Sequence, residues 1–135
     1  MTREEYEFDS CVTTAAKHFH EQSGNYPTKE FVVRMLQEKR NAFRFSPDCH
    51  WRATRIQKQT YIWFAYSETI RRIVESSETD PIRSIYRFYY YMDDMIGKHA
   101  NDNLMVWEFM GTMQDTVRKI LDLCRGLKGE TKWGN

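Results

Sequence analysis

The chain contains few of the residues that interrupt helices, with only three prolines and six scattered glycines in 135 residues. Proline removes a backbone N–H and glycine adds backbone freedom, so both destabilise helices and their scarcity leaves long uninterrupted segments. The glycines also do not gather into a loop of the kind that holds phosphates. The sequence therefore favours a helical protein without a glycine-rich nucleotide site.

Cysteines and long apolar runs are scarce as well. Cys11, Cys49 and Cys124 are widely spaced and odd in number, which is typical of reduced thiols rather than of a disulfide framework. No apolar run reaches about 18 residues, so we predict no membrane span and no membrane partner. The segment from Met1 to Glu5 is polar and acidic, unlike a signal peptide. We expect a cytoplasmic protein.

The sequence shows no recognisable metal site. His18 and His20 are two residues apart, so on a helix their side chains point about 200° apart and cannot share a metal. Cys49 and His50 form a single adjacent pair, whereas structural zinc sites combine two close pairs of ligands. We therefore expect neither a metal nor a cofactor.

Two short motifs resemble those of enzymes. The tetrapeptide Tyr91-Met92-Asp93-Asp94 resembles the active-site motif of reverse transcriptases, in which carboxylates on a β-hairpin hold metal ions. Here it lies within a helical pattern in a chain too short for a polymerase palm and fingers. We expect Met92 to pack in the core and both aspartates to face solvent.

The second motif is an arginine followed by a histidine. Arg44 and His50 resemble the Arg…His motif of HEPN-type helical ribonucleases, which implies a histidine that activates a ribose hydroxyl and an arginine that steadies the phosphate. No serine, cysteine or lysine has a recognisable partner for nucleophilic catalysis. We predict that the chain is not an enzyme, with a helical ribonuclease as the catalytic alternative.

Apolar spacing and capping signals predict an all-α fold, a compact bundle of about five helices with one long central helix. The chain is expected to be a single domain over 1–135, with a helical hairpin in 1–45, a long helix and helical hairpin in 46–126, and a flexible tail in 127–135. The expected helices are Arg3 to Gln22 ending at Gly24, Thr28 onward with Thr28 as N-cap, Pro47 to Ser77, Pro81 to about Gly97 with Asp80 as N-cap, and Asn101 or Asp102 to about Gly126. The apolar spacing predicts inner faces that include Ile73 and Val74 in the third helix, Tyr89 and Met92 in the fourth, and Met105, Val117 and Cys124 in the last.

Aromatic residues make up 15% of the chain, more than a minimal core of this size requires. The segment from Tyr61 to Tyr66 is apolar on all sides of a helix, so it must be covered on several sides in a bundle or an oligomer. Three consecutive tyrosines on a helix cannot all face one core, because successive residues diverge by about 100°. We therefore expect an interface, with a homodimer as one possibility, at Tyr61, Trp63, Phe64, Tyr89, Tyr90 and Tyr91.

Charge is segregated along the chain although the net charge is only +1. Residues 29–58 contain eight basic and three acidic residues, a net charge of +5, whereas residues 1–27 contain two basic and five acidic residues, a net charge of −3. Such a basic segment indicates a surface for an anionic partner.

The turn before this segment resembles a known DNA-binding family. Ala15-Ala16, the turn Gly24-Asn25-Tyr26-Pro27-Thr28, Val32 and Leu36 together resemble the opening of KfrA-type plasmid DNA-binding domains and of some winged-helix repressors. The resemblance implies a helix-turn-helix whose next helix, around Pro47 to Lys58, enters the major groove. It would present arginine to guanine edges and lysine to phosphates.

Two functions follow from these patterns. The first is a small non-catalytic nucleic-acid-binding or regulatory protein, with DNA preferred over RNA. Its contacts are expected at Lys29, Arg34, Lys39, Arg40, Arg44, His50, Arg52, Arg55 and Lys58. The alternative is a protein-binding adaptor or inhibitor, of the kind found in phages and mobile elements, that binds a larger partner stoichiometrically through exposed aromatic residues.

Overall fold

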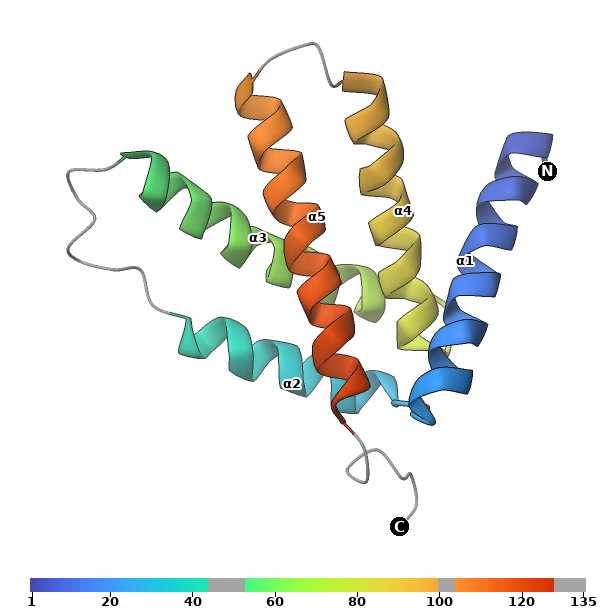
Figure 1. Cartoon of the computed structure of the whole chain (residues 1–135). Coiled ribbons are helices and arrows are strands. Elements are labelled where there is room, and N and C mark those ends of the chain that lie inside the picture. Colours follow the sequence, from blue (N-terminus) through green and yellow to red (C-terminus); the bar gives the residue numbers. More distant parts are fainter. Residues whose placement is uncertain (44–52, 100–103, 128–135) are drawn as a thin grey trace.

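The computed structural model describes residues 1–43, 53–99 and 104–127, with the backbone alone for 53–57. These ranges form five α-helices and no β-strand (Figure 1), which confirms the all-α prediction. The helices are α1 Arg3–Ser23, α2 Lys29–Ala42, α3 Ala53–Glu75, α4 Pro81–His99 and α5 Leu104–Arg125. None of them combines the length and apolarity that crossing a bilayer requires.

Local capping interactions fix both ends of α1. Thr2 and Glu5 form a capping box, in which each side chain accepts a hydrogen bond from the backbone of the other. At the other end Gly24 adopts φ 68°, and its N–H donates to the carbonyl of His20. A left-handed residue of this kind is favoured as glycine, as the sequence predicts.

The predicted starts of α2 and α4 are also confirmed. Thr28 precedes α2, and its side chain accepts a hydrogen bond from the N–H of Phe31. Pro81 is the first residue of α4, where its missing N–H costs nothing, and Asp80 Oδ1 accepts from the N–H of Ile82. The predicted starts of α3 at Pro47 and of α5 at Asn101 or Asp102 lie outside the described residues.

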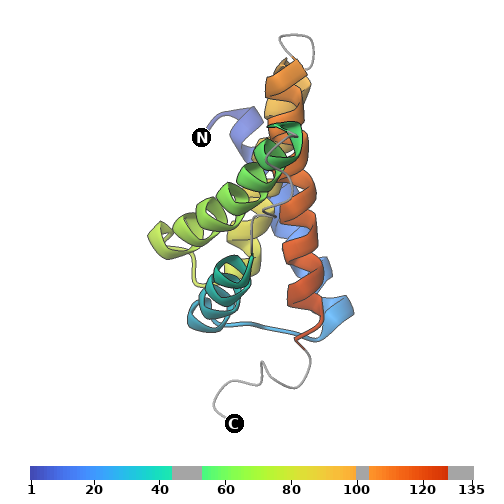
Figure 2. The same ribbon diagram turned by 90° about the vertical axis from the view of Figure 1, so that its left-hand side faces the viewer.

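The first helix does not pack mainly on its neighbour in the chain. α1 packs on α4, α2 packs on α3, and α5 packs on both α3 and α4. Figure 1 shows α1 running beside α4 while α2 runs beside α3, and Figure 2 shows α2 and the end of α3 to one side of α5. The two helices of the predicted 1–45 hairpin therefore pack on different partners. α3 contacts three other helices, in keeping with a central position.

One apolar core joins all five helices. Its members are buried side chains spaced three or four residues apart along each helix. The largest fully buried apolar residues are Phe19, Phe88, Leu36, Ile73, Ile82, Ile85, Ile120, Val12, Val32 and Val117. Leu127, which we placed at the start of a flexible tail, is buried against the end of α5.

Two positions differ from the predicted apolar stripes. Val74 is 61% exposed, because Ile73 takes the core position on the last turns of α3 and the next residue is turned by about 100°. Phe88 is buried in α4, whereas we assigned the neighbouring Tyr89, which is half-buried, to the inner face. Met92 packs in the core as predicted.

The twin aspartates lie on the outer surface of α4, as the helical interpretation predicts. Asp93 Oδ1 accepts a hydrogen bond of 3.1 Å from Gln114, and Asp94 forms an ion pair of 3.0 Å with Lys98 one turn later. Neither contact holds the two carboxylates around a common point. The tetrapeptide therefore lacks the β-hairpin that presents the corresponding carboxylates in a polymerase.

Candidate interaction surface

Two of the predicted nucleic-acid contacts help to hold α2 against α3. Lys29 Nζ donates to the carbonyl of Ser76 just beyond the end of α3, at 2.5 Å. Arg40 Nη1 donates to Ser67 Oγ at 3.3 Å, and its guanidinium carbon lies 5.6 Å from the centre of the Trp63 ring. Lys29 thus satisfies the Ser76 carbonyl, and Arg40 lies over the face of the Trp63 ring. Both side chains therefore contribute to the stability of the fold.

The exposed cations of α2 point in different directions. Arg34 lies one turn from Glu30 and one turn from Glu38, so this face alternates between acidic and basic side chains. Lys39 lies about 140° around the helix from Arg34. Lys58 is exposed on α3. The described cations therefore do not form one continuous basic strip on α2.

The remaining members of the predicted basic surface are not placed. Arg44, His50 and Arg52 lie outside the described residues, and only the backbone is described for Arg55. The same holds for the Arg44 and His50 pair of the ribonuclease alternative. A major-groove contact by this segment stays a prediction.

The six predicted interface aromatics divide into exposed and half-buried rings. Trp63, Phe64 and Tyr91 are exposed, while Tyr61, Tyr89 and Tyr90 are half-buried. The tyrosine triple diverges as helix geometry requires. The hydroxyl of Tyr89 accepts a hydrogen bond of 3.0 Å from Arg118, whereas Tyr91 lies under the guanidinium of Arg72 at 5.1 Å.

A larger apolar surface surrounds the start of α5. Leu104 is 70% exposed, Met105 57% and Trp107 51%. Figure 1 shows these first turns of α5 (orange) extending past α3 beside the end of α4. Monomers seldom leave several large apolar side chains together in water without a partner.

Aromatic contacts connect this helix start to α3. The ring of Phe109, one turn beyond Met105, lies 4.8 Å from that of Tyr61 and 6.0 Å from that of Phe64. Phe64 is itself 43% exposed. We name this surface the apolar tip and define it as Tyr61, Phe64, Leu104, Met105, Trp107 and Phe109.

The sequence interpretation missed four of the six residues of the apolar tip. Tyr61 and Phe64 were predicted as interface residues, but Met105 was placed on the inner face and Leu104 and Trp107 were not assigned. The available signal was the run from Leu104 to Met110, in which Glu108 is the only charged residue. A helix start that is apolar on all sides cannot bury every side chain on one neighbour.

An acidic cleft of about 810 Å³ separates the first turns of α1 from the last turns of α4. Its charged lining comprises six carboxylates and two cations, a net charge of −4, from Glu4, Glu5, Glu7, Asp9, Asp93, Asp94, Arg87 and Lys98. Hydrogen bonds from Arg87 and the charges of Arg87 and Arg83 lower the pKa of Asp9. This cleft repels a phosphate backbone.

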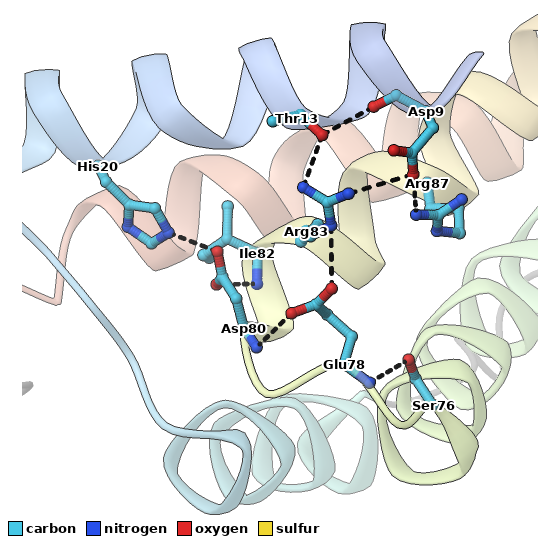
Figure 3. Close-up of polar contacts among 9 residues, drawn as sticks. All are labelled: Asp9, Thr13, His20, Ser76, Glu78, Asp80, Ile82, Arg83 and Arg87. Atoms are coloured by element: carbon cyan, nitrogen blue, oxygen red, sulfur yellow. Dashed lines mark hydrogen bonds and ion pairs between the residues drawn. The ribbon is translucent and has the colours of Figure 1, made fainter. Parts of the chain in front are cut away.

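A histidine–aspartate pair lies beside a pocket of about 480 Å³ (Figure 3). His20 Nε2 is 2.7 Å from Asp80 Oδ2, and His20 Nδ1 is 2.5 Å from the carbonyl oxygen of Asn25. A general base needs one ring nitrogen within reach of the substrate proton, but both nitrogens here are used internally. In this arrangement the pair stabilises the fold by joining α1 to the loop before α4. It joins residues 60 positions apart, so no local sequence pattern reveals it.

Within the described ranges no three histidine, cysteine or acidic side chains converge as metal ligands. Comparison with known proteins adds no assignment: models of protein families, curated proteins and solved structures yield no match to this chain.

Proposed function

We propose that this chain is a non-catalytic protein-binding module that attaches stoichiometrically to a larger protein through the apolar tip. The observation that supports this most directly is the exposure of Leu104, Met105 and Trp107 in the first turn of α5, the helix whose Phe109 ring lies 6.0 Å from that of the exposed Phe64. Aromatic residues and methionine are enriched at protein interfaces, where they anchor in pockets of the partner.

The exposed area is large enough to matter energetically. Full burial of a large apolar side chain contributes about 1.5–3 kcal/mol. The four exposed members of the tip, Phe64, Leu104, Met105 and Trp107, already have about half of their surface buried. A partner that covers the rest therefore gains about 4 kcal/mol of binding free energy. A micromolar complex has a net binding free energy of about −8 kcal/mol. The partner therefore also needs polar contacts around the rim of the tip.

The distribution of charge favours a protein over a nucleic acid as the partner. The cations of α2 diverge or bind α3, and the α1–α4 cleft is acidic. A nucleic-acid surface would instead gather cations along a track for the phosphate backbone. Arg34, Lys39 and Lys58 are exposed, so DNA or RNA binding is the competing outcome of the experiment below.

The experiment compares capture of host proteins by three forms of the chain. The wild type, a Met105→Ser/Trp107→Ser variant and a Val74→Asp control are immobilised and exposed to lysate with and without nuclease treatment. Val74 is a matched control because it is an exposed apolar residue on the far end of α3. We expect one stoichiometric protein that the wild type and the control retain and the double variant loses.

Two results would overturn the proposal. One is equal capture by the double variant and the wild type, which would mean that the apolar tip does not bind the partner. The other is a bound species that disappears with nuclease treatment and whose affinity falls steeply with salt, which identifies a nucleic acid. Light scattering on the purified chain identifies a third outcome. In it a second copy of the chain covers the tip, so the wild type is a dimer and the double variant is a monomer.

A further inference from the structure

His20 connects the end of α1 with the turn that follows it and with the α3–α4 loop, 60 residues away. It lies in the last turn of α1, accompanied by Asn25 of the α1–α2 turn and Asp80 of the α3–α4 loop. Figure 3 shows its ring directed toward the Asp80 carboxylate, away from the Arg83 contacts. The His20 and Asp80 side chains are 12% and 27% exposed, so water competes weakly for the bond between them.

Both ring nitrogens of His20 face oxygen atoms that accept hydrogen bonds. The Asn25 backbone carbonyl can only accept, and so can an ionised carboxylate. Asp80 Oδ1 already accepts the N–H of Ile82 at 3.0 Å, the usual role of an ionised N-cap. Both His20 nitrogens must therefore carry a hydrogen for the two short contacts to be satisfied, and that form is the imidazolium cation.

We infer that His20 is a proton-dependent latch between the α1–α2 turn and the α3–α4 loop. The imidazolium donates to both Asn25 and Asp80. The neutral ring has only one N–H, so it donates to one of them and leaves the other oxygen facing a ring nitrogen lone pair. Loss of one ring proton therefore removes one hydrogen bond and the ion pair with Asp80.

The other charged groups around His20 do not replace Asp80 as its partner. Glu78 accepts from the N–H of Asp80 at 3.4 Å and pairs with Arg83 at 2.9 Å, and Arg83 also pairs with Asp9. Tyr26 stacks on the ring at 4.5 Å and Phe19 meets it edge-on. The remaining charged neighbours from the packed elements are Lys29 and Glu30 of α2, which line the same pocket, and Arg125 of α5, which lies over Phe19.

The latch reaches the end of α5 through the same turn. The backbone carbonyl of Asn25 accepts a hydrogen bond from His20. The side-chain Nδ2 of Asn25 donates to the carbonyls of Cys124 and Arg125 at 3.2 and 2.9 Å. A loosened Asn25 therefore releases the carboxyl-terminal end of α5 as well as the end of α1. Protonation of one ring controls how firmly α1 and α5 are joined to the α3–α4 loop.

The test measures the folding equilibrium constant by urea denaturation at pH 5.5 and pH 8.5 in four proteins. These are the wild type, His20→Gln, Asp80→Asn and the control His18→Gln, which removes an exposed histidine from the same helix. Asp80→Asn keeps a good N-cap for α4 while removing the carboxylate charge. The protonated form makes both bonds, so the contribution of His20 to wild-type stability is larger at pH 5.5 than at pH 8.5.

We expect the constant to fall about tenfold more between the two pH values in the wild type and His18→Gln than in His20→Gln, with Asp80→Asn close to His20→Gln. An equal fall in all four proteins would refute the latch. NMR of the wild-type imidazole nitrogens provides a second readout that needs no variant. We expect hydrogens on both His20 nitrogens at pH 5.5, and a bare nitrogen at that pH refutes the proposal even if a variant fails to fold.

Discussion

Removal of the Asn25 side chain should destabilise the whole fold, although Asn25 lies in a turn. The residue is 2% exposed, and its amide closes the α1–α2 turn onto the last carbonyls of α5. Asn25→Ala deletes two hydrogen bonds worth about 1 kcal/mol each and removes this donor from the Arg125 carbonyl, while the Cys124 carbonyl keeps the Leu127 N–H, so we expect a loss of about 2–4 kcal/mol. The free energy of unfolding of a small domain is about 5–15 kcal/mol, so this loss is a large share of the total.

Asn25→Asp tests the same contact with nearly the same shape. A carboxylate directs two acceptor oxygens at carbonyl oxygens, so at pH 7 this variant should be less stable than Asn25→Ala. Protonation of the carboxyl restores one donor, and repulsion from the carbonyls raises the pKa of this carboxyl in the folded state. The deficit should therefore shrink as pH falls toward about 4, the unfolded value, and stay constant below it. Urea unfolding followed by circular dichroism measures both effects, with the exposed Gln37→Ala as the control.

The reasoning fails if Asn25→Ala unfolds within about 0.5 kcal/mol of the wild type, the range typical of surface substitutions. It also fails if Asn25→Asp is as stable as the wild type at pH 7. Either result would mean that the carbonyls at the end of α5 are satisfied without Asn25 and that the turn contributes little to the fold.

Two further predictions concern titratable side chains. Burial raises the pKa of the Cys124 thiol to about 12. At pH 8 a thiol reagent should therefore label the exposed Cys11 rapidly and the buried Cys124 only after unfolding. Mass spectrometry of the labelled peptides would measure both rates, and equal rates would contradict the burial of Cys124. The pKa of Asp9 is lowered by hydrogen bonds and charges from Arg87 and Arg83, so the carboxylate stabilises the fold above its unfolded value of 3.8 and this contribution is lost as pH falls through the lower folded value. Asp9→Asn should therefore be less stable than the wild type at pH 7 and the difference should vanish in strong acid, as urea denaturation across pH would measure; a difference that grows toward acid pH would reverse the assigned sign.

Local signals in the sequence were sufficient for the helices and several of their ends. Gly24 ends α1, and Asp80-Pro81 begins α4, because capping depends on atoms within about four residues. Burial periodicity likewise identified most of α5, including Val117 and Cys124. These features could be read from the chain because each is decided within one or two helical turns.

Long-range pairing could not be obtained in the same way. The bonds from Lys29 to Ser76 and from His20 to Asp80 join residues 47 and 60 positions apart. They depend on which helices become neighbours, and a basic residue has the same local pattern whether it binds a phosphate or a helix carbonyl. Charge counting along 29–58 therefore predicted a basic surface that includes Lys29, which contacts α3 in the structure.

Neighbouring helices, and not the spacing of apolar residues alone, also determine which side chains of an apolar helix face the core. Val74 was predicted on the inner stripe and is exposed, whereas the buried Phe88 lies one residue from the predicted Tyr89. The choice between adjacent residues depends on the rotation of the helix against its partner. The apolar tip was missed in part for the same reason, since Met105 fits an inner stripe equally well in the sequence.

The pairing of α1 with α4 rather than with α2 has a consequence for biosynthesis. An isolated helix is marginal in water, and α1 finds its packing surface only after α4 has been synthesised. The apolar face of α1, with Val12 and Phe19, therefore stays accessible to chaperones until α4 has been synthesised. A product that ends before Pro81 lacks the helix that makes the main contact with α1.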